Sequence, residues 1–134
     1  MNAEWLDGPR NYMWQIQHCK FPVIAAVAGP CMTGGMELAL NCDIIIASPT
    51  ALFRDTHSTF GIVPGGGMTQ ILPRIVGLQN AKYASFTGIP IDAKTALSWG
   101  LVSEVCSQAF SQKKTKIVCR DFDSINIFFD SINE

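Results

Sequence analysis

Two segments in which apolar residues follow one another place the strongest constraint on what this chain can fold into. They are PVIAAVAG at 22–29 and DIIIAS at 43–48. Strands that are buried on both faces carry consecutive apolar residues, whereas half-exposed strands alternate apolar and polar residues. The segment between the two runs, residues 34–42, has the pattern of a helix. The order strand, helix, strand therefore predicts an α/β protein with crossover connections.

The rest of the chain up to residue 106 supplies further elements, separated by glycine and proline. Asp92 and Gly100 bracket one of the predicted helices, as its N-cap and its C-terminal stop. The sequence predicts helices at 10–18, 67–75, 78–86 and within 90–100, short strands at 51–54 and 101–105, and a loop at 57–67.

The segment from residue 107 onward differs in composition from what precedes it. It repeats DSIN, at 123–126 and 130–133, and has neither a helical nor a strand period. We expect 107–134 to be a divergent tail, with disorder as one alternative and INIFF at 125–129 as a candidate strand.

Composition and charge exclude several classes of function. A length of 134 residues and a hydrophobic content of 48% predict one packed domain. The formal net charge of -1 provides no field that would recruit nucleic acid or an anionic membrane. The longest apolar run, residues 21–28, is too short to span a bilayer.

The cysteines and the N-terminal residues bear on the cellular compartment. Five cysteines without a CxxC pair favour a reduced, intracellular protein, with neither zinc nor disulfides expected. Cys31 and Cys42 are expected to be small buried hydrophobes. The first ten residues resemble neither a signal peptide nor a transit peptide. Mitochondria, peroxisome and cytosol all stay open as expectations, since a targeting signal could lie in a missing N-terminus.

The stretch CMTGGMELALNCD, residues 31–43, combines paired glycines with an acid in the first turn of the predicted helix. A helix N-terminus presents unpaired N–H groups, and at Gly34 and Gly35 a ligand can approach them closely. Such a site stabilises a carbonyl oxygen that gains negative charge, and Glu37 could move a proton on the adjacent carbon. In the alternative interpretation, Glu37 only favours the helix dipole.

Three motifs resemble the crotonase superfamily, also called the enoyl-CoA hydratase/isomerase family: KFPVIAAVAGPCMTGGMELALNCDIIIASPTALF, FGIVPGGGMTQILPRIVG and TGIPIDAKTALSWGLVSEV. The resemblance covers about residues 12–106. It implies a spiral of repeated ββα units, an acyl-CoA thioester as substrate, and trimers or dimers of trimers. The family's upstream A-G-x-D-L-like segment and its C-terminal helices are not matched, so residues 1–106 are expected to be a partial domain, incomplete at both ends.

The resemblance also implies roles for individual residues. Gly34 is similar to the N–H donor that holds the thioester oxygen, and Glu37 to the first acid/base carboxylate. His57 occupies the position where the hydratases carry a second Glu. It is a candidate second catalytic group, because imidazole titrates near neutral pH, or else an ordinary loop or capping histidine. Asp55, two residues earlier, is another nearby acid, and we expect it to be a solvated turn acid.

The remaining candidates are predicted to contact substrate. They lie beside the paired glycines and in the Pro-Gly-rich turn, where core packing is the alternative role. The predicted substrate-binding residues are Gly35, Met36, Pro64, Gly65 and Gly66.

The function implied is enoyl-CoA hydration or isomerisation, with thioester hydrolysis as another chemistry for the same site. A different class remains open: an inactive fragment that binds acyl-CoA or associates with full-length subunits. No metal or redox cofactor is implied, since CoA is the handle of the substrate. Neither a dinucleotide-binding G-x-G-x-x-G nor a phosphate-binding G-x-x-x-x-G-K motif is found.

Overall fold

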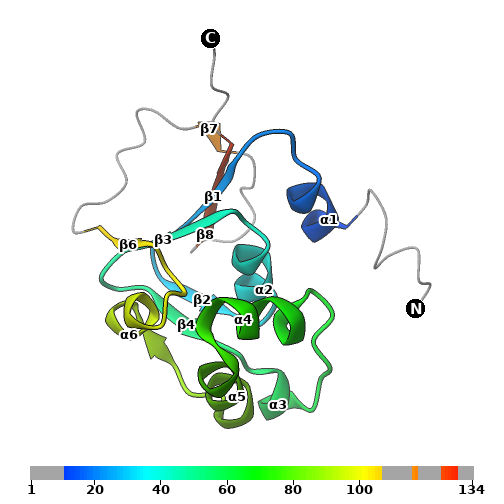
Figure 1. Cartoon of the computed structure of the whole chain (residues 1–134), viewed down its shortest axis with the longest axis vertical. Helices are drawn as coiled ribbons and strands as arrows, with labels where there is room; N and C mark the ends of the chain where they lie inside the picture. The colour runs from blue at the N-terminus through cyan, green and yellow to red at the C-terminus, as the bar shows by residue number, and fades with distance from the viewer. Residues whose placement is uncertain (1–10, 107–115, 118–124, 130–134) are drawn as a thin grey trace.

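The computed structural model describes residues 11–106, 116–117 and 125–129, and within these ranges it contains two sheets and six helices. Figure 1 shows their arrangement. The strands are β1 (Val23–Val27), β2 (Pro30–Met32), β3 (Ile44–Ala47), β4 (Leu52–Arg54), β5 (Ile91–Asp92), β6 (Glu104–Val105), β7 (Lys116–Ile117) and β8 (Ile125–Phe129). The helices are α1 (Tyr12–Gln17), α2 (Gly34–Leu40), α3 (His57–Phe60), α4 (Met68–Val76), α5 (Leu78–Thr87) and α6 (Ala93–Ser98).

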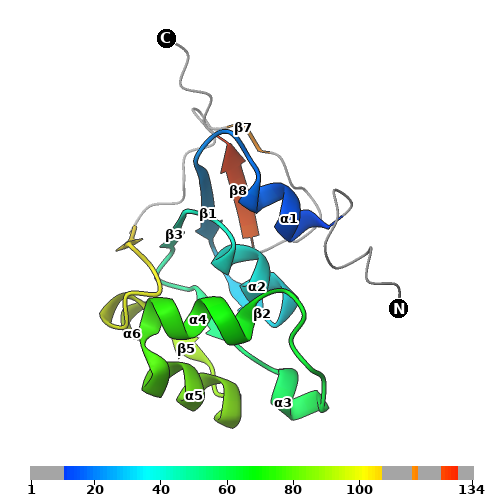
Figure 2. The same ribbon diagram turned by 45° about the vertical axis from the view of Figure 1, so that its right-hand side comes forward.

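The larger sheet has the strand order β6-β3-β1-β8-β7, and β1 lies at its centre. β1 pairs in parallel with β3, with Ala25 opposite Ile45, and antiparallel with β8, with Ala25 opposite Ile127. Figure 2 shows β1 and β8 side by side. Four of the five residues of β1 are buried, so side chains on both faces of the strand lie in the interior, which explains the consecutive apolar run.

A repeated ββα unit organises the first half of the chain. β1, β2 and α2 form one unit, and β3, β4 and α3 form the next. Equivalent strands of the two units pair in parallel, β1 with β3 in the larger sheet and β2 with β4 in the smaller one, whose order is β2-β4-β5. The predicted α/β fold of repeated ββα units is therefore confirmed.

Helix α2 is buried on almost every side. All residues from Gly35 to Leu40 are buried, and Met36 has no exposed surface. A helix with no solvent-facing stripe belongs to the core, and here it contacts β2 and α4. The single carboxylate of α2, Glu37, is consequently carried into the interior.

Several predicted elements are confirmed, with ends that differ by one or two residues. The helices predicted at 10–18, 34–42, 67–75 and 78–86 correspond to α1, α2, α4 and α5, with the break at Gly77 as predicted. In the 107–134 segment the candidate strand INIFF forms β8. The remaining residues of that segment, apart from β7, lie outside the described residues.

The loop predicted at 57–67 is wrong in its first part, because residues 57–60 form α3. Glycine and proline start only at Gly61, which ends α3 in the left-handed conformation, with φ 64°. The short strands β2 and β5 were not predicted, since three and two residues give no readable period. The strand predicted at 101–105 shortens to β6.

No helix in the described part of the chain has the length and apolar character needed to cross a membrane.

The cap of α6 gives a prediction about acid stability. Asp92 Oδ1 accepts the Thr95 N–H at 2.7 Å, as predicted for an N-cap. Hydrogen bonds from Thr95, from its side chain first and then from its backbone, lower the pKa of Asp92. A carboxyl with a lowered pKa in the folded state stabilises the fold above its unfolded pKa, about 4. This contribution is lost as the pH falls through the folded value.

We therefore expect the melting temperature of the wild type to exceed that of Asp92→Asn most above about pH 5, and the gap to close below about pH 4. The asparagine still accepts the cap hydrogen bond but does not titrate. Thermal melts of both proteins across this pH range provide the measurement. A gap that stays constant over the whole range would show that ionised Asp92 makes no special contribution.

Candidate active site

Glu37 lies in the first turn of α2 with its carboxylate turned into the protein. The residue is 4% exposed. Its Oε1 accepts hydrogen bonds from the backbone N–H groups of Gly66, at 2.7 Å, and Met68, at 3.2 Å. Gly66 lies in the turn before α4 and Met68 is the first residue of α4, so the start of this helix fixes one carboxylate oxygen and leaves Oε2 to face another group.

The group that Oε2 faces is the imidazole of His57, at the start of α3. His57 Nε2 lies 3.7 Å from Glu37 Oε2, and His57 Nδ1 lies 2.6 Å from Asp55 Oδ1. A carboxylate can only accept, so Nδ1 carries a hydrogen and donates it to Asp55. This hydrogen bond fixes the ring with Nε2 toward Glu37.

The burial of Asp55 corrects the expectation that it is a solvated turn acid. Asp55 is 1% exposed, and its Oδ1 accepts both the His57 ring N–H and the His57 backbone N–H, the latter at 3.0 Å. Only two residues separate β4 from α3, so the Asp55 side chain folds back onto the start of the helix. The Asp-x-His spacing was the available sequence signal.

Gly66 allows the turn to approach the carboxylate closely. A Cβ built on Gly66 would lie 2.5 Å from Met13 Cε and 2.8 Å from both Cδ and Oε2 of Glu37. These distances are shorter than real Cβ contacts, so a side chain at this position would displace one of the two neighbours. The turn therefore approaches Glu37 so closely that a side chain at residue 66 has room only if Met13 or Glu37 moves.

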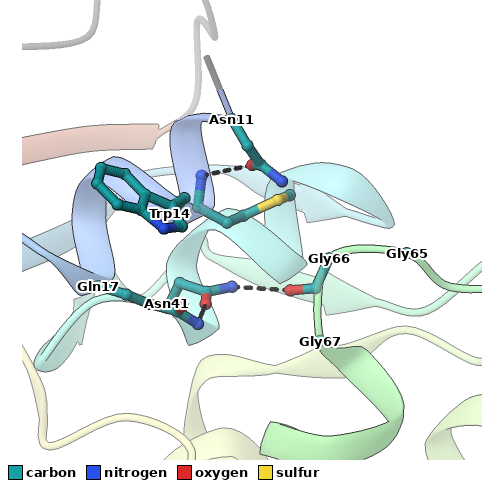
Figure 3. Close-up of a pocket in the computed structure, with 8 residues that line it drawn as sticks. Asn11, Trp14, Gln17, Asn41, Gly65, Gly66 and Gly67 are labelled. Atoms are coloured by element: carbon teal, nitrogen blue, oxygen red, sulfur yellow. Dashed lines mark hydrogen bonds between the residues drawn. The ribbon is translucent and has the colours of Figure 1, made fainter. Parts of the chain in front are cut away.

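This turn also lines a cavity of about 160 Å³ (Figure 3). Of the predicted substrate-binding residues, Gly65 and Gly66 line it, whereas Pro64, Gly35 and Met36 do not. The lining also includes three amide side chains that the sequence analysis did not single out. The lining residues are Asn11, Met13, Trp14, Gln17, Asn41, Gly65, Gly66 and Gly67.

The N-terminus of α2 begins with an exposed glycine. The N-cap, Thr33, has φ 48°, a conformation that costs about 1–3 kcal/mol for a residue other than glycine. Within residues 11–106, the Thr33 side chain makes no cap hydrogen bond; it pairs with the Thr56 hydroxyl instead. A Cβ built on Gly34 would meet no atom within 4 Å, so the space beside its backbone is open.

The predicted site residues are thus not all brought together. Glu37 and His57 lie side by side, with Gly66 against Glu37. Gly34 lies one turn before Glu37 at the exposed end of the same helix, and Met36 is fully buried in the core.

The two cysteines nearest to α2 in the sequence, Cys31 and Cys42, are not reactive groups of the site. Burial raises the pKa of the Cys31 thiol to about 12, and it does the same for Cys42, so neither is a ready nucleophile at neutral pH. Cys31 is fully buried and Cys42 half-buried, in line with their expected packing role. Among the described residues, no three His, Cys, Asp or Glu side chains are grouped so that they could hold a metal ion.

Two features define the class of protein: the repeated ββα units, and the buried Glu37 in the first turn of a helix that begins with two glycines. The chain has the crotonase fold.

Comparisons with known proteins identify the family. The sequence profile described as Enoyl-CoA hydratase/isomerase matches residues 5–127, and the chain belongs to this family. A curated relative, the probable peroxisomal enoyl-CoA hydratase 1 of Arabidopsis thaliana, is 41% identical over 102 residues, 76% of this chain and 38% of that protein.

Solved structures agree with this assignment. The enoyl-CoA hydratase of Bacillus anthracis has a TM-score of 0.69 and 42% identity, over 71% of this chain and 37% of that one. The enoyl-CoA hydratase/isomerase of Cupriavidus metallidurans CH34 has a TM-score of 0.68 and 42% identity, over 71% of this chain and 36% of that one. The chain thus spans less than two fifths of the length of the relatives it matches.

Proposed function

We propose that this chain acts on enoyl-CoA thioesters, as a hydratase in the first place, with Glu37 as general base and acid. The observation that carries the proposal is the position of the buried Glu37 carboxylate. One of its oxygens is held by two backbone N–H groups, and the other faces an imidazole that Asp55 orients. Membership of the enoyl-CoA hydratase/isomerase family supports it.

Each group has a distinct role in the proposed reaction. The Gly34 N–H donates to the thioester oxygen, where negative charge develops as an enolate-like state forms. Glu37 transfers a proton at the carbon next to the thioester carbonyl. The residues Gly35, Met36, Pro64, Gly65 and Gly66 stay as predicted contacts of the substrate or of the groups that shape its site.

The distance between Glu37 and His57 favours hydration over isomerisation. Atoms 3.7 Å apart can both lie within hydrogen-bond reach of one water oxygen. A hydratase must direct one water at one carbon and a proton at the next, which two neighbouring proton carriers can share. Isomerisation needs only a single carboxylate that moves a proton between carbons, and thioester hydrolysis needs a water activated by Glu37.

The direct test is an assay of the purified protein with crotonyl-CoA. We expect the enoyl absorbance to decrease as water adds across the double bond, with the 3-hydroxyacyl thioester as product. Release of free CoA, measured as its thiol, would instead identify hydrolysis of the thioester to the free acid. An unchanged absorbance under conditions where crotonyl-CoA binds would overturn the hydratase proposal.

A second candidate function is binding of acyl-CoA, or association with longer relatives, without turnover. The lengths favour this alternative, because the chain matches only 38% of the Arabidopsis relative and 36% of the Cupriavidus structure. Mixing the protein with a full-length relative and sizing the complex tests it, and separate elution of the two proteins would count against it. A trimeric or hexameric assembly and the cellular compartment stay predictions.

His57 gives a prediction specific to the proposed second group. His57→Gln keeps a polar side chain at this position, but it removes a group able to exchange protons. We expect the rate of crotonyl-CoA hydration to fall by about 10²–10⁴-fold. The matched control is His18→Gln, since His18 is exposed and stacks on Trp14. Equal rates for His57→Gln and wild type would assign His57 to structure alone.

A further inference from the structure

The backbone N–H and carbonyl of Gly66 are both hydrogen-bonded to side chains, one from α2 and one from the residue that caps α2. Its N–H donates to Glu37 Oε1 at 2.7 Å, and its carbonyl accepts from Asn41 Nδ2 at 2.8 Å. Asn41 is the C-cap residue of α2, four residues after Glu37, so both side chains leave the same face of the helix. Figure 3 shows the Asn41 amide directed at the Gly66 carbonyl.

The orientation of the Asn41 amide is determined by its partners. Nδ2 donates to the carbonyls of Gly66 and Glu37, each at 2.8 Å, while Oδ1 accepts from Gln17 Nε2 of α1. Turning the amide over would set Oδ1 against two carbonyls and Nδ2 against an N–H donor, so only one orientation satisfies all three contacts. Asn41 is 9% exposed, which makes an unpaired amide costly.

The segment that Asn41 holds has little rigidity of its own. Gly65, Gly66 and Gly67 follow one another, and Gly67 adopts φ 101°. Glycine populates many backbone conformations, so three in a row need external contacts to keep one N–H in a fixed direction. The Gly66 N–H must nevertheless point at Glu37 Oε1 for the carboxylate to keep its orientation.

We propose that Asn41 is a positioning residue for the acid/base group: by holding the Gly66 carbonyl, it fixes the Gly66 N–H that orients the Glu37 carboxylate. The inference rests on the proposed function of Glu37. Gln17 contributes indirectly to the same positioning, because its side chain donates to Asn41 Oδ1 and so orients the Asn41 amide. Neither residue touches the carbons that react.

The test uses Asn41→Leu, which keeps a buried side chain of similar size and removes both donated hydrogen bonds. Two measurements are made on the same protein: hydrogen exchange of the Gly66 N–H by NMR, and turnover of crotonyl-CoA. We expect faster exchange at Gly66, and kcat lower by about 10- to 100-fold with little change in KM. In a Glu37→Gln background, Asn41→Leu should cause no further loss of activity.

Two further variants keep the outcome decisive. Asn80→Leu is the matched control, since Asn80 Nδ2 also donates to a carbonyl four residues earlier, that of Val76, at 2.9 Å. It should leave exchange at Gly66 and turnover unchanged. If Asn41→Leu does not fold, Gln17→Met, at an exposed residue, should show the same two effects at smaller size.

Unchanged exchange at Gly66 in Asn41→Leu would overturn the inference whatever the activity. Faster exchange with an unchanged kcat would overturn it as well. A wild type that binds crotonyl-CoA without turnover is a different result: it would overturn the proposed function, while the exchange measurement still decides whether Asn41 holds Gly66.

Discussion

Glu37→Gln is expected to lower the turnover of crotonyl-CoA by about 10²–10⁴-fold or more, and to leave binding of the thioester largely intact. Glutamine is close in size to glutamate, and its amide oxygen can still accept the N–H groups of Gly66 and Met68. What the variant loses is the ability to take up and return a proton. Stopped assays for activity and calorimetry for binding separate the two effects.

The matched control for this substitution is Glu104→Gln, the same chemical change at an exposed residue of β6. Its turnover should equal that of the wild type. Thermal melts of both variants verify that each is folded. A Glu37→Gln protein that keeps wild-type turnover would remove Glu37 from the mechanism, and with it the main support for the hydratase proposal.

Gly66→Ala is expected to destabilise the fold by about 1–3 kcal/mol, the usual cost of forcing an extra group into a packed site. The added Cβ would lie 2.5 Å from Met13 Cε, at the end of a flexible side chain, and 2.8 Å from the Glu37 carboxylate. Met13 can move aside, whereas Glu37 is fixed by hydrogen bonds from Gly66 and Met68. Activity should therefore decrease together with stability.

Gly34→Ala provides the comparison, because its Cβ would meet no atom within 4 Å and the backbone there is not left-handed. The free energy of unfolding should stay the same or rise by up to about 1 kcal/mol, since alanine is the better helix former. Denaturant unfolding of both variants measures the contrast. Equal stability of the two would show that the turn at Gly66 relaxes freely and that close packing does not require its glycine.

The sequence was sufficient for the elements whose signal is local. The buried strands β1 and β3 are visible as apolar runs, and the start of α2 is marked by paired glycines with Glu37 one turn later. Asp92 as a cap follows from the same kind of local rule, and the structure confirms it. Resemblance to a family supplied the arrangement of the units, which no local pattern contains.

The features that were missed are of two kinds: a short connection that no turn residue marks, and contacts between partners distant in the sequence. Burial of Asp55 depends on a two-residue connection between β4 and α3, and no glycine or proline marks that connection. The donors to Glu37 are Gly66 and Met68, and the role of Asn41 appears only once the turn at Gly66 is placed against it. Contacts of this kind come from packing, so periodicity and propensity cannot find them.

The Glu37 carboxylate is held by pieces of chain that are not neighbours in sequence: α2 carries it, the turn before α4 donates to it, and α3 faces it. No one of these pieces can keep that geometry alone. Partial opening of any of them disturbs the same few atoms, so the site has no subset that could survive local unfolding. Loss of function on heating should consequently follow the least stable of these pieces and precede the cooperative loss of tertiary structure.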